Sequence, residues 1–267
     1  MPDWPTYPTS GSPLSLAELA KTQIRGPLYY YLRHLALADV RHVIDDFEGD
    51  TINLDNYAVA NGGGASVASF AISVQENGAI RGTTGTAGND TASASIIGPK
   101  TWKGDRQCGI EIRWTPITAV TECRFECGFV DVVPGSSKSV VNSLTTPTVN
   151  TSVVDAAVNV FNDASSVITN ELVTIGTSID AAKHTFTAGT TRAAATSVRT
   201  RIQLGGPAGV GNFVKMWDDG ILVASGTSGT AYIEGGSAVC AWARVSASDG
   251  TSKSMDIDYI EIWALRL

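Results

Sequence analysis

Three carboxylates near the C-terminus have a spacing that could support catalysis. Asp256, Asp258 and Glu261 form the pattern D-x-D-x-x-E inside an apolar run. Retaining hydrolysis of a glycosidic bond needs two carboxyl groups about 5 Å apart, one of them with a raised pKa. Side chains alternate between the two faces of a strand, so Glu261 is expected opposite the other two acids unless a bulge intervenes. We therefore predict no catalytic residues in this chain.

The run that holds these acids, residues 254 to 265, is instead predicted to be a structural strand. Its β-branched and aromatic residues favour a sheet, and it ends two residues before the end of the sequence. We expect the acids at 256 and 258 to face solvent and the alternate side chains to pack inward, namely Ile257, Tyr259 and either Glu261 or Trp263. Neutralising the acids should then cost little stability, whereas removing residues 255 to 267 should unfold the domain.

No other set of reactive side chains predicts a site. The histidines His34, His42 and His184 are distant in sequence from the cysteines, and no G-x-S-x-G motif or phosphate-binding loop accompanies them. The cysteines lie in strand-like surroundings and are interpreted as buried thiols of a protein made in a reducing cytosol; they are Cys108, Cys123, Cys127 and Cys240. We expect no metal and no cofactor, because neither the thiols nor the scattered oxygen ligands have suitable spacing.

The composition predicts a sheet-rich globular protein. Of the 267 residues, 43% are hydrophobic, only 17% are charged and 27 are glycines, which is typical of a β protein with many turns. The net charge of −7 argues against a nucleic-acid partner, because binding to phosphates requires a basic face. The sequence has no apolar run of about 18 residues and no recognisable secretory signal, so we expect no membrane span.

Residues 1 to 46 are predicted to form an arm that differs from the rest of the chain. Ser15 and Glu18 fit a capping box at the start of a helix, and Gly26-Pro27 ends it. Pro27 also suits the first turn of a second helix. On its Tyr-rich face lie Leu28, Tyr31, Leu32 and Leu35, and Tyr29 and Tyr30 add aromatic surface that the helix cannot bury alone. These residues are expected to pack on the chain's own β-domain, to anchor the chain to another subunit, or to do both.

Residues 47 to 267 are predicted to form one β-sandwich. Ten short alternating runs separated by turn residues have the pattern of strands: 66–74, 108–115, 124–132, 153–161, 185–187, 197–204, 212–217, 221–224, 238–246 and 255–263. The sharpest hairpin signal is Asp219-Gly220 between two apolar runs. About ten strands without a helix in this part imply a mainly β fold with two antiparallel sheets packed face to face.

Three segments resemble the concanavalin A-like, or laminin-G-like, jelly roll. They are Asp46 to Gly49, the hairpin from Phe213 to Val223, and the closing strand from Asp256 to Trp263. The resemblance implies a two-sheet jelly roll for residues 47 to 267. Glycoside hydrolases of the laminarinase type have this fold and carry E-x-D-x-x-E on an inner strand, whereas the related pattern here begins with Asp and lies on the closing strand.

Lectin-like members of this fold hold glycans with an aromatic platform beside Asp and Asn side chains in loops at the ends of the sheets. The resemblance therefore implies a candidate glycan site at Trp102, Trp217, Asp218 and Asp219. Trp102 is the best candidate for an exposed aromatic, because polar residues flank it. The alternative is that Trp102 packs its loop onto the core.

The combination of an arm and a Gly- and Thr-rich sandwich also resembles the virion proteins of tailed bacteriophages. This resemblance implies a non-enzymatic structural protein of the virion, a capsid decoration protein or a head or tail appendage, assembled in the host cytoplasm. Its expected partners are other virion proteins and copies of itself, in a trimer, bound through the arm. The alternatives are a carbohydrate-binding module for host attachment and a glycoside hydrolase.

Overall fold

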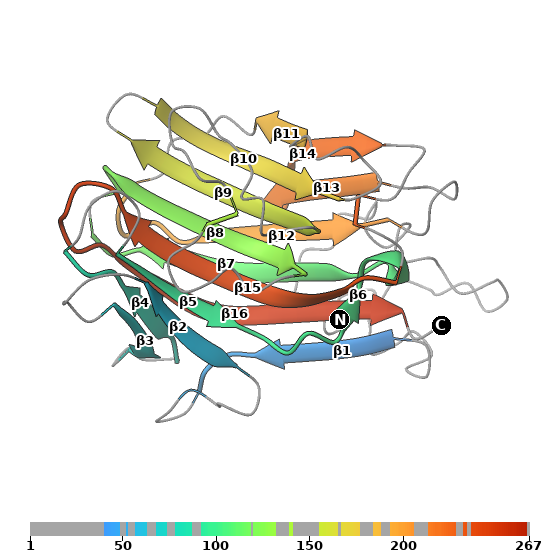
Figure 1. Cartoon of the computed structure of the whole chain (residues 1–267), viewed down its shortest axis with the longest axis horizontal. Helices are drawn as coiled ribbons and strands as arrows, with labels where there is room; N and C mark the ends of the chain where they lie inside the picture. Colours follow the sequence, from blue (N-terminus) through green and yellow to red (C-terminus); the bar gives the residue numbers. More distant parts are fainter. Residues whose placement is uncertain are drawn as a thin grey trace, which may run out of the picture.

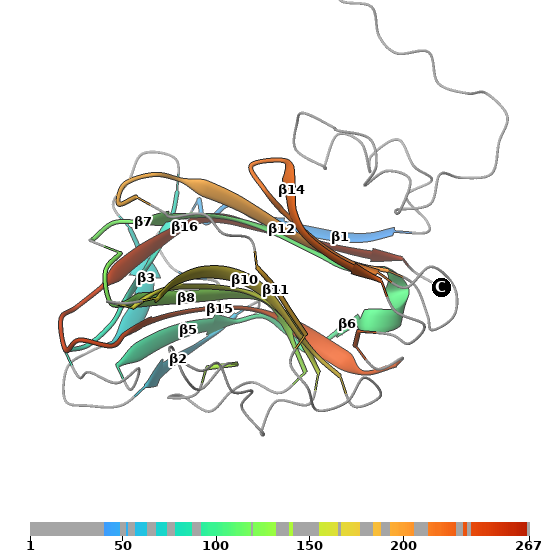
Figure 2. The same ribbon diagram turned by 90° about the horizontal axis from the view of Figure 1, so that it is seen from above.

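The protein is a sandwich of two antiparallel β-sheets. The computed structural model describes residues 40–48, 52, 57–62, 68–73, 78–86, 92–118, 120–131, 139–140, 155–164, 167–176, 184–187, 193–205, 213–227, 232–233 and 236–265. Within these ranges the chain forms strands β1 to β16 and the 3-10 turn η1 (Gly104–Arg106). Figure 2 shows the sheets as two stacked, curved layers. The mainly β, two-sheet fold predicted from the sequence is confirmed.

The first sheet, named sheet A here, contains the strand that closes the chain. Its strands are β1 (Val40–Asp45), β3 (Ser69–Ile72), β4 (Ile80–Thr83), β7 (Gly109–Pro116), β12 (Val198–Leu204), β13 (Phe213–Asp218), β14 (Ile221–Thr227) and β16 (Ser254–Leu265). They follow the order β14-β13-β12-β7-β16-β4-β3. On the side away from β7, β16 pairs first with β4 and then, toward its C-terminal end, with β1 (Figure 1).

The second sheet, sheet B, covers the other side of the core. Its strands are β2 (Ala58–Gly62), β5 (Ser93–Ile97), β6 (Trp102–Lys103), β8 (Cys123–Val130), β9 (Ala156–Ala164), β10 (Val167–Ile175), β11 (His184–Thr187) and β15 (Ala238–Ala247). Their order is β11-β10-β9-β8-β15-β5-β2, and β6 pairs with the start of β15. Because β15 leads directly into β16, the loop between them connects the centres of the two sheets.

The core between the sheets is built from alternate residues of the strands. Trp114 of β7 lies at its centre, with its ring centroid 4.6 Å from that of Phe125 and 5.8 Å from that of Phe161. Cys123 and Cys127 lie on the same inward face as Phe125, as alternation predicts. All four cysteines are buried and free, so the prediction of buried thiols is confirmed. Burial raises the pKa of the Cys240 thiol to about 11.

All ten predicted strands occur in the structure, with bounds shifted by a few residues. The strands β1, β2, β4, β5, β6 and β10 were not predicted from the sequence. The first of these, β1, falls within the predicted arm and yet forms six residue pairs with β16. The predicted helices and the Tyr-rich face of the arm lie outside the described residues, and no helix within those residues is long and apolar enough to cross a membrane.

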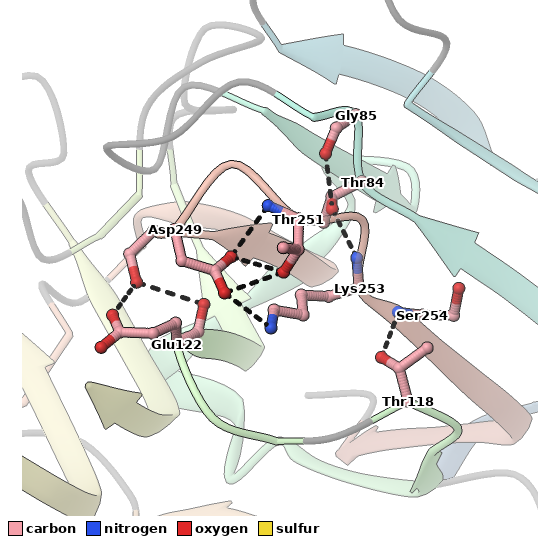
Figure 3. A network of polar contacts seen from close by, with 9 residues as sticks. Thr84, Gly85, Thr118, Glu122, Asp249, Thr251, Lys253 and Ser254 are labelled. Carbon is pink, nitrogen blue, oxygen red and sulfur yellow. Dashed lines mark hydrogen bonds and ion pairs between the residues drawn. The ribbon is translucent and has the colours of Figure 1, made fainter. Parts of the chain in front are cut away.

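The loop between β15 and β16 is fixed by a polar network that spans both sheets (Figure 3). Asp249 accepts hydrogen bonds from the backbone N–H of Thr251 at 3.0 Å and from its hydroxyl at 2.7 Å, and Lys253 Nζ lies 3.1 Å from Asp249 Oδ2. The neighbouring Ser248 donates to Glu122 just before β8, while Lys253 N donates to Thr84 Oγ1 just after β4. The network thus joins the ends of strands from sheet A and sheet B.

Stability should depend on the ionisation of Asp249. Burial opposes ionisation of this carboxyl, but the hydrogen bonds from Thr251 and Lys253 outweigh it and lower its pKa from 3.8 to about 2. A carboxyl with a depressed folded-state pKa stabilises the fold above its unfolded pKa, and this stabilisation is lost as the pH falls through the folded value. Asp249→Asn should lower the Tm by about 2 °C at pH 7, since the group is partly exposed, and the difference from the wild type should vanish near pH 2.

Thermal melts of the wild type and the variant between pH 2 and pH 7 measure this difference. Glu48→Gln is a matched control, because Glu48 is exposed and its substitution also removes one negative charge. A constant difference between wild type and Asp249→Asn across this range would contradict the assigned role.

Candidate functional site

A β-bulge in β16 determines which side chains form the site. The register between β16 and β7 shifts between Ile257 and Tyr259, so Asp258 is the additional residue. Ile257 before the bulge and Ile260 after it both face the core. Tyr259 and Glu261 therefore lie on the outer face of sheet A. The prediction that Tyr259, with either Glu261 or Trp263, packs inward is wrong for Tyr259 and Glu261, because the bulge reverses the alternation on which it was based.

The acids of this strand do not form the solvent-facing row that the sequence predicted. Asp256 is only 4% exposed and accepts two hydrogen bonds from Arg81 of β4, at 2.7 and 2.9 Å. Glu261 is 1% exposed. Asp258, whose side chain is 32% exposed, pairs with Arg113 Nη1 at 2.9 Å. Each acid therefore has a partner on a neighbouring strand: an arginine for Asp256 and Asp258, and His42 for Glu261.

Two buried carboxylates lie directly opposite each other on this outer face. The register of β7 and β16 pairs Glu111 with Glu261, and Glu111 is only 2% exposed. Like charges opposite each other on adjacent strands are destabilising unless other groups compensate them. Glu111 was not predicted to be a site residue, although Glu111 and Arg113 alternate along the predicted strand 108–115 in the pattern of one polar face.

Three side chains surround the carboxylate of Glu111. Two nitrogens of Arg201, on β12, contact Glu111 Oε2 at 2.7 and 2.6 Å. The Tyr259 hydroxyl donates to Glu111 Oε1 at 2.5 Å, and Arg199 Nε lies 3.8 Å from the same oxygen. Burial, followed by the negative charge of Glu111 and the hydrogen bond to it, raises the pKa of Tyr259 well above its ordinary value. Tyr259 is therefore a fixed hydrogen-bond donor at neutral pH.

Glu261 has its polar partner on β1, on the side of β16 away from β7. His42 Nε2 lies 2.8 Å from Glu261 Oε1, and the register pairs Ile44 with Glu261 itself. The strand that the sequence placed in the arm thus supplies a polar partner to the acid and an exposed apolar side chain beside it. Within the described part of the chain, no group of three or more His, Cys, Asp or Glu side chains is placed to hold a metal ion.

A pocket of about 480 Å³ opens next to these acids, on the outer face of sheet A. This volume is within the range of small-molecule sites. Its lining combines basic, acidic, hydroxyl, aromatic and apolar side chains from β1, β7, β12 and the residue before it, β16 and the β13–β14 turn: Ile44, Arg113, Ser197, Arg199, Asp219, Tyr259 and Glu261. Donors and acceptors therefore converge on one open hollow.

The predicted glycan residues divide between the surface and the interior. Asp219 lines the pocket, and its Oδ1 accepts a hydrogen bond from the backbone N–H of Arg199 at 3.0 Å. Trp217 is half-buried and lies opposite Arg201 on the same outer face. Asp218 points inward instead, is 5% exposed, and accepts hydrogen bonds from Thr200 and Asn170. Alternation explains the difference, because successive residues of β13 face opposite sides.

Trp102 does not form an exposed platform. Its side chain is 2% exposed within the core, and the guanidinium of Arg41 lies 4.4 Å from its ring centroid. The prediction that Trp102 is an exposed aromatic is wrong, and the alternative, a tryptophan that packs its loop onto the core, is confirmed. Polar neighbours in sequence were misleading, because β6 pairs with β15 and turns the indole inward.

The outer face of sheet B is covered where residues 139 and 140 cross it. Val140 is fully buried in an apolar cluster that also contains Val130, Val158 and Trp242, and its N–H donates to Glu126 Oε2 at 2.8 Å. Glu126 itself lies buried between two arginines, 3.7 Å from Arg124 and from Arg244. The polar residues of this face are therefore closed off, whereas those of sheet A line an open pocket.

The fold is similar to that of several solved structures. The carbohydrate recognition domain of Emp47p matches with 9% identity and a TM-score of 0.56 over 84% of this chain and 94% of that one. A pseudo β-1,3-glucanase of Mycobacterium tuberculosis matches with 12% identity and a TM-score of 0.55 over 83% and 98%. A protein of unknown function from Shewanella oneidensis MR-1 matches with 13% identity and a TM-score of 0.53 over 96% and 97%.

These similarities assign the fold to the concanavalin A-like jelly-roll sandwiches, as the sequence resemblance implied. At these identities they show the fold alone. No family model matches the sequence, and no curated protein matches it.

The partners of Glu111 should make it the more costly of two acids to remove from this face. Glu111→Ala leaves Arg201 and Tyr259 without their buried acceptor, so we expect the free energy of unfolding to fall by about 3 kcal/mol. Asp258→Ala removes a partly exposed ion pair and should cost less than about 1 kcal/mol. Urea denaturation followed by circular dichroism measures both, and equal losses would contradict the assigned network.

Proposed function

We propose that this protein is a non-enzymatic carbohydrate-binding module and that its glycan site is the pocket on the outer face of sheet A. The observation that carries the proposal is the lining of that pocket. Carboxylates of Asp219 and Glu261 offer acceptors to sugar hydroxyls, and guanidinium groups of Arg113 and Arg199 offer donors. Such polar groups, held in place beside an aromatic ring, are typical of sites that orient a polar ligand.

The similar structures support this reading of the fold. One is a carbohydrate recognition domain, and another is described as a pseudo β-1,3-glucanase. A fold shared by binding and hydrolytic proteins does not itself decide between them, so the side chains of the pocket must. Trp217 and Asp219, which the sequence analysis proposed as glycan contacts, both lie on the face that carries the pocket.

The arrangement of the acids favours binding over hydrolysis. A glycosidase needs one carboxyl group that can give a proton to the leaving oxygen and a second that is free to attack or to activate water. Both oxygens of Glu111 already accept hydrogen bonds, from Arg201 and Tyr259. Glu261 is paired with His42, and Asp258 with Arg113. These contacts fit acids that position ligands and neighbours.

The virion role stays a prediction from the sequence. The residues proposed for attachment, 28 to 35, lie outside the described residues, and the similar structures named above give no link to phage proteins. A carbohydrate-binding module could still serve a particle in host attachment. Removing residues 1 to 39, which leaves β1 in place, and measuring oligomeric state and particle binding tests this prediction.

Glycan binding should depend on side chains that line the pocket. We expect Asp219→Ala to lower the affinity for a bound oligosaccharide at least about tenfold, because it removes an acceptor for sugar hydroxyls. The probe is a glycan array, followed by calorimetric titration with the best oligosaccharide. Asp46→Ala is the control, since Asp46 is an exposed acid outside the pocket. Absence of binding on the array, or equal affinity of the two variants, would exclude this site.

A second measurement separates binding from hydrolysis. Release of reducing sugar from the bound oligosaccharide should stay at the background level for the wild type. Turnover by the wild type that is lost in Glu261→Gln, with folding unchanged, would show a glycoside hydrolase instead.

A further inference from the structure

The pocket contains a pair of like charges that points to the class of its ligand. We propose that the ligand is an acidic saccharide, one that carries a carboxylate or a sulfate group which binds between Arg113 and Arg199. This inference rests on the proposed function and adds the charge of the sugar. It follows from the register of the strands, from the different distances of the two arginines to their acidic partners, and from the positions of the other acids in the pocket.

The register of β7 and β12 places Arg113 and Arg199 directly opposite each other. Both line the pocket, so both side chains lie on the outer face of sheet A. Opposite residues on adjacent antiparallel strands have Cβ atoms only about 5 Å apart, and two like charges in that position repel each other. A pair of guanidinium groups on an open face thus forms a position where an oxyanion is favoured.

The two arginines differ in how closely an acid neutralises their charge. Arg113 has a close partner in Asp258, at 2.9 Å. Arg199 Nε instead lies 3.8 Å from Glu111 Oε1, and the oxygens of Glu111 already accept shorter hydrogen bonds from Arg201 and Tyr259. A guanidinium carries five N–H donors arranged to bind a carboxylate or a sulfate through two of them. Arg199 therefore retains donor capacity toward the pocket.

The backbone around Arg199 is fixed, which prepares its side chain for binding. Its N–H donates to Asp219 Oδ1 at 3.0 Å, and its C=O accepts from the Asp219 N–H at 2.9 Å. These bonds tie the start of β12 to the turn after β13. A ligand that binds there meets a strand that is already ordered, so less conformational entropy is lost on binding.

The acids in the pocket determine how such a ligand is oriented. Glu261 and Asp219 also line the hollow, and they would repel an anionic group while accepting hydrogen bonds from hydroxyls. The acidic group of the sugar would therefore lie between the arginines, with its ring hydroxyls toward the carboxylates. Neither a neutral sugar nor a simple anion satisfies both sets of side chains.

Calorimetric titration of the full chain with three matched probes tests this inference. The probes are an oligogalacturonide, the same oligosaccharide with its carboxyl groups reduced to alcohols, and a sulfated neutral oligosaccharide of equal length. We expect the wild type to bind at least one acidic probe about tenfold or more tightly than the reduced one, with a preference that falls as salt is raised. Arg199→Gln should abolish this preference, whereas Lys103→Gln, which removes an exposed positive charge outside the pocket, should keep it.

The outcomes separate the two proposals. A preference for the oligogalacturonide identifies a carboxylate ligand, and one for the sulfated probe identifies a sulfate ligand. Equal affinity for acidic and reduced probes would overturn the inference while leaving carbohydrate binding intact. Binding of none of the probes, together with no binding on the glycan array, would overturn both. A full acidic preference in an Arg199→Gln variant whose Tm is unchanged would show that the anion binds elsewhere.

Discussion

The arrangement of sheet A depends on the single additional residue at Asp258. A strand presents alternate residues to opposite faces, so a shift of one residue exchanges the faces of everything that follows. Without the bulge, the pattern that buries Ile257 would turn Glu261 into the apolar core and Ile260 and Ile262 out of it. With the bulge, the isoleucines on both sides of Asp258 pack inward. The bulge also lies where β16 changes partner, between the pairing with β4 up to Ile257 and the pairing with β1 from Ile260 (Figure 1).

The outer faces of the two sheets differ in accessibility. On sheet B, Glu126 and its two arginines are covered by residues 139 and 140 and by a second apolar cluster. On sheet A, Glu111 and Glu261 sit under Arg201, Tyr259 and His42, and the arginines beside them line an open pocket. Buried ion networks contribute little net stability, because desolvation opposes the Coulomb attraction. The network of sheet A, which lies beside an open pocket, is therefore better explained by ligand recognition than by stability.

The fold was more predictable from the sequence than the site. Alternation in runs such as Ser197–Leu204 and the Asp219-Gly220 turn reflects local geometry, and these elements occur where they were expected. The missed strand β5, S-A-S-I-I, is buried at every residue and so has no alternation to detect. The strand β1 was assigned to the arm, because nothing local distinguishes it until β16 pairs with it.

The site was harder to predict because it is assembled from distant residues. The pair of Glu111 and Glu261 and the pair of Arg113 and Arg199 depend on strand register, which the sequence does not reveal. The bulge at Asp258 was considered as an exception, but no residue in D-x-D-x-x-E marks it. Trp102 was misplaced because its polar neighbours in sequence do not reveal that β6 pairs with β15.

The bulge in β16 brings Tyr259 and Glu261 to the outer face of sheet A, where we propose the glycan site. The most direct measurement is a crystal structure of the protein with an acidic oligosaccharide bound. We expect the sugar to lie against Tyr259 and Glu261, with its acidic group between Arg113 and Arg199, and β16 to keep the additional residue at Asp258. Sugar bound to another face, or a regular β16 with Glu261 in the core, would contradict it.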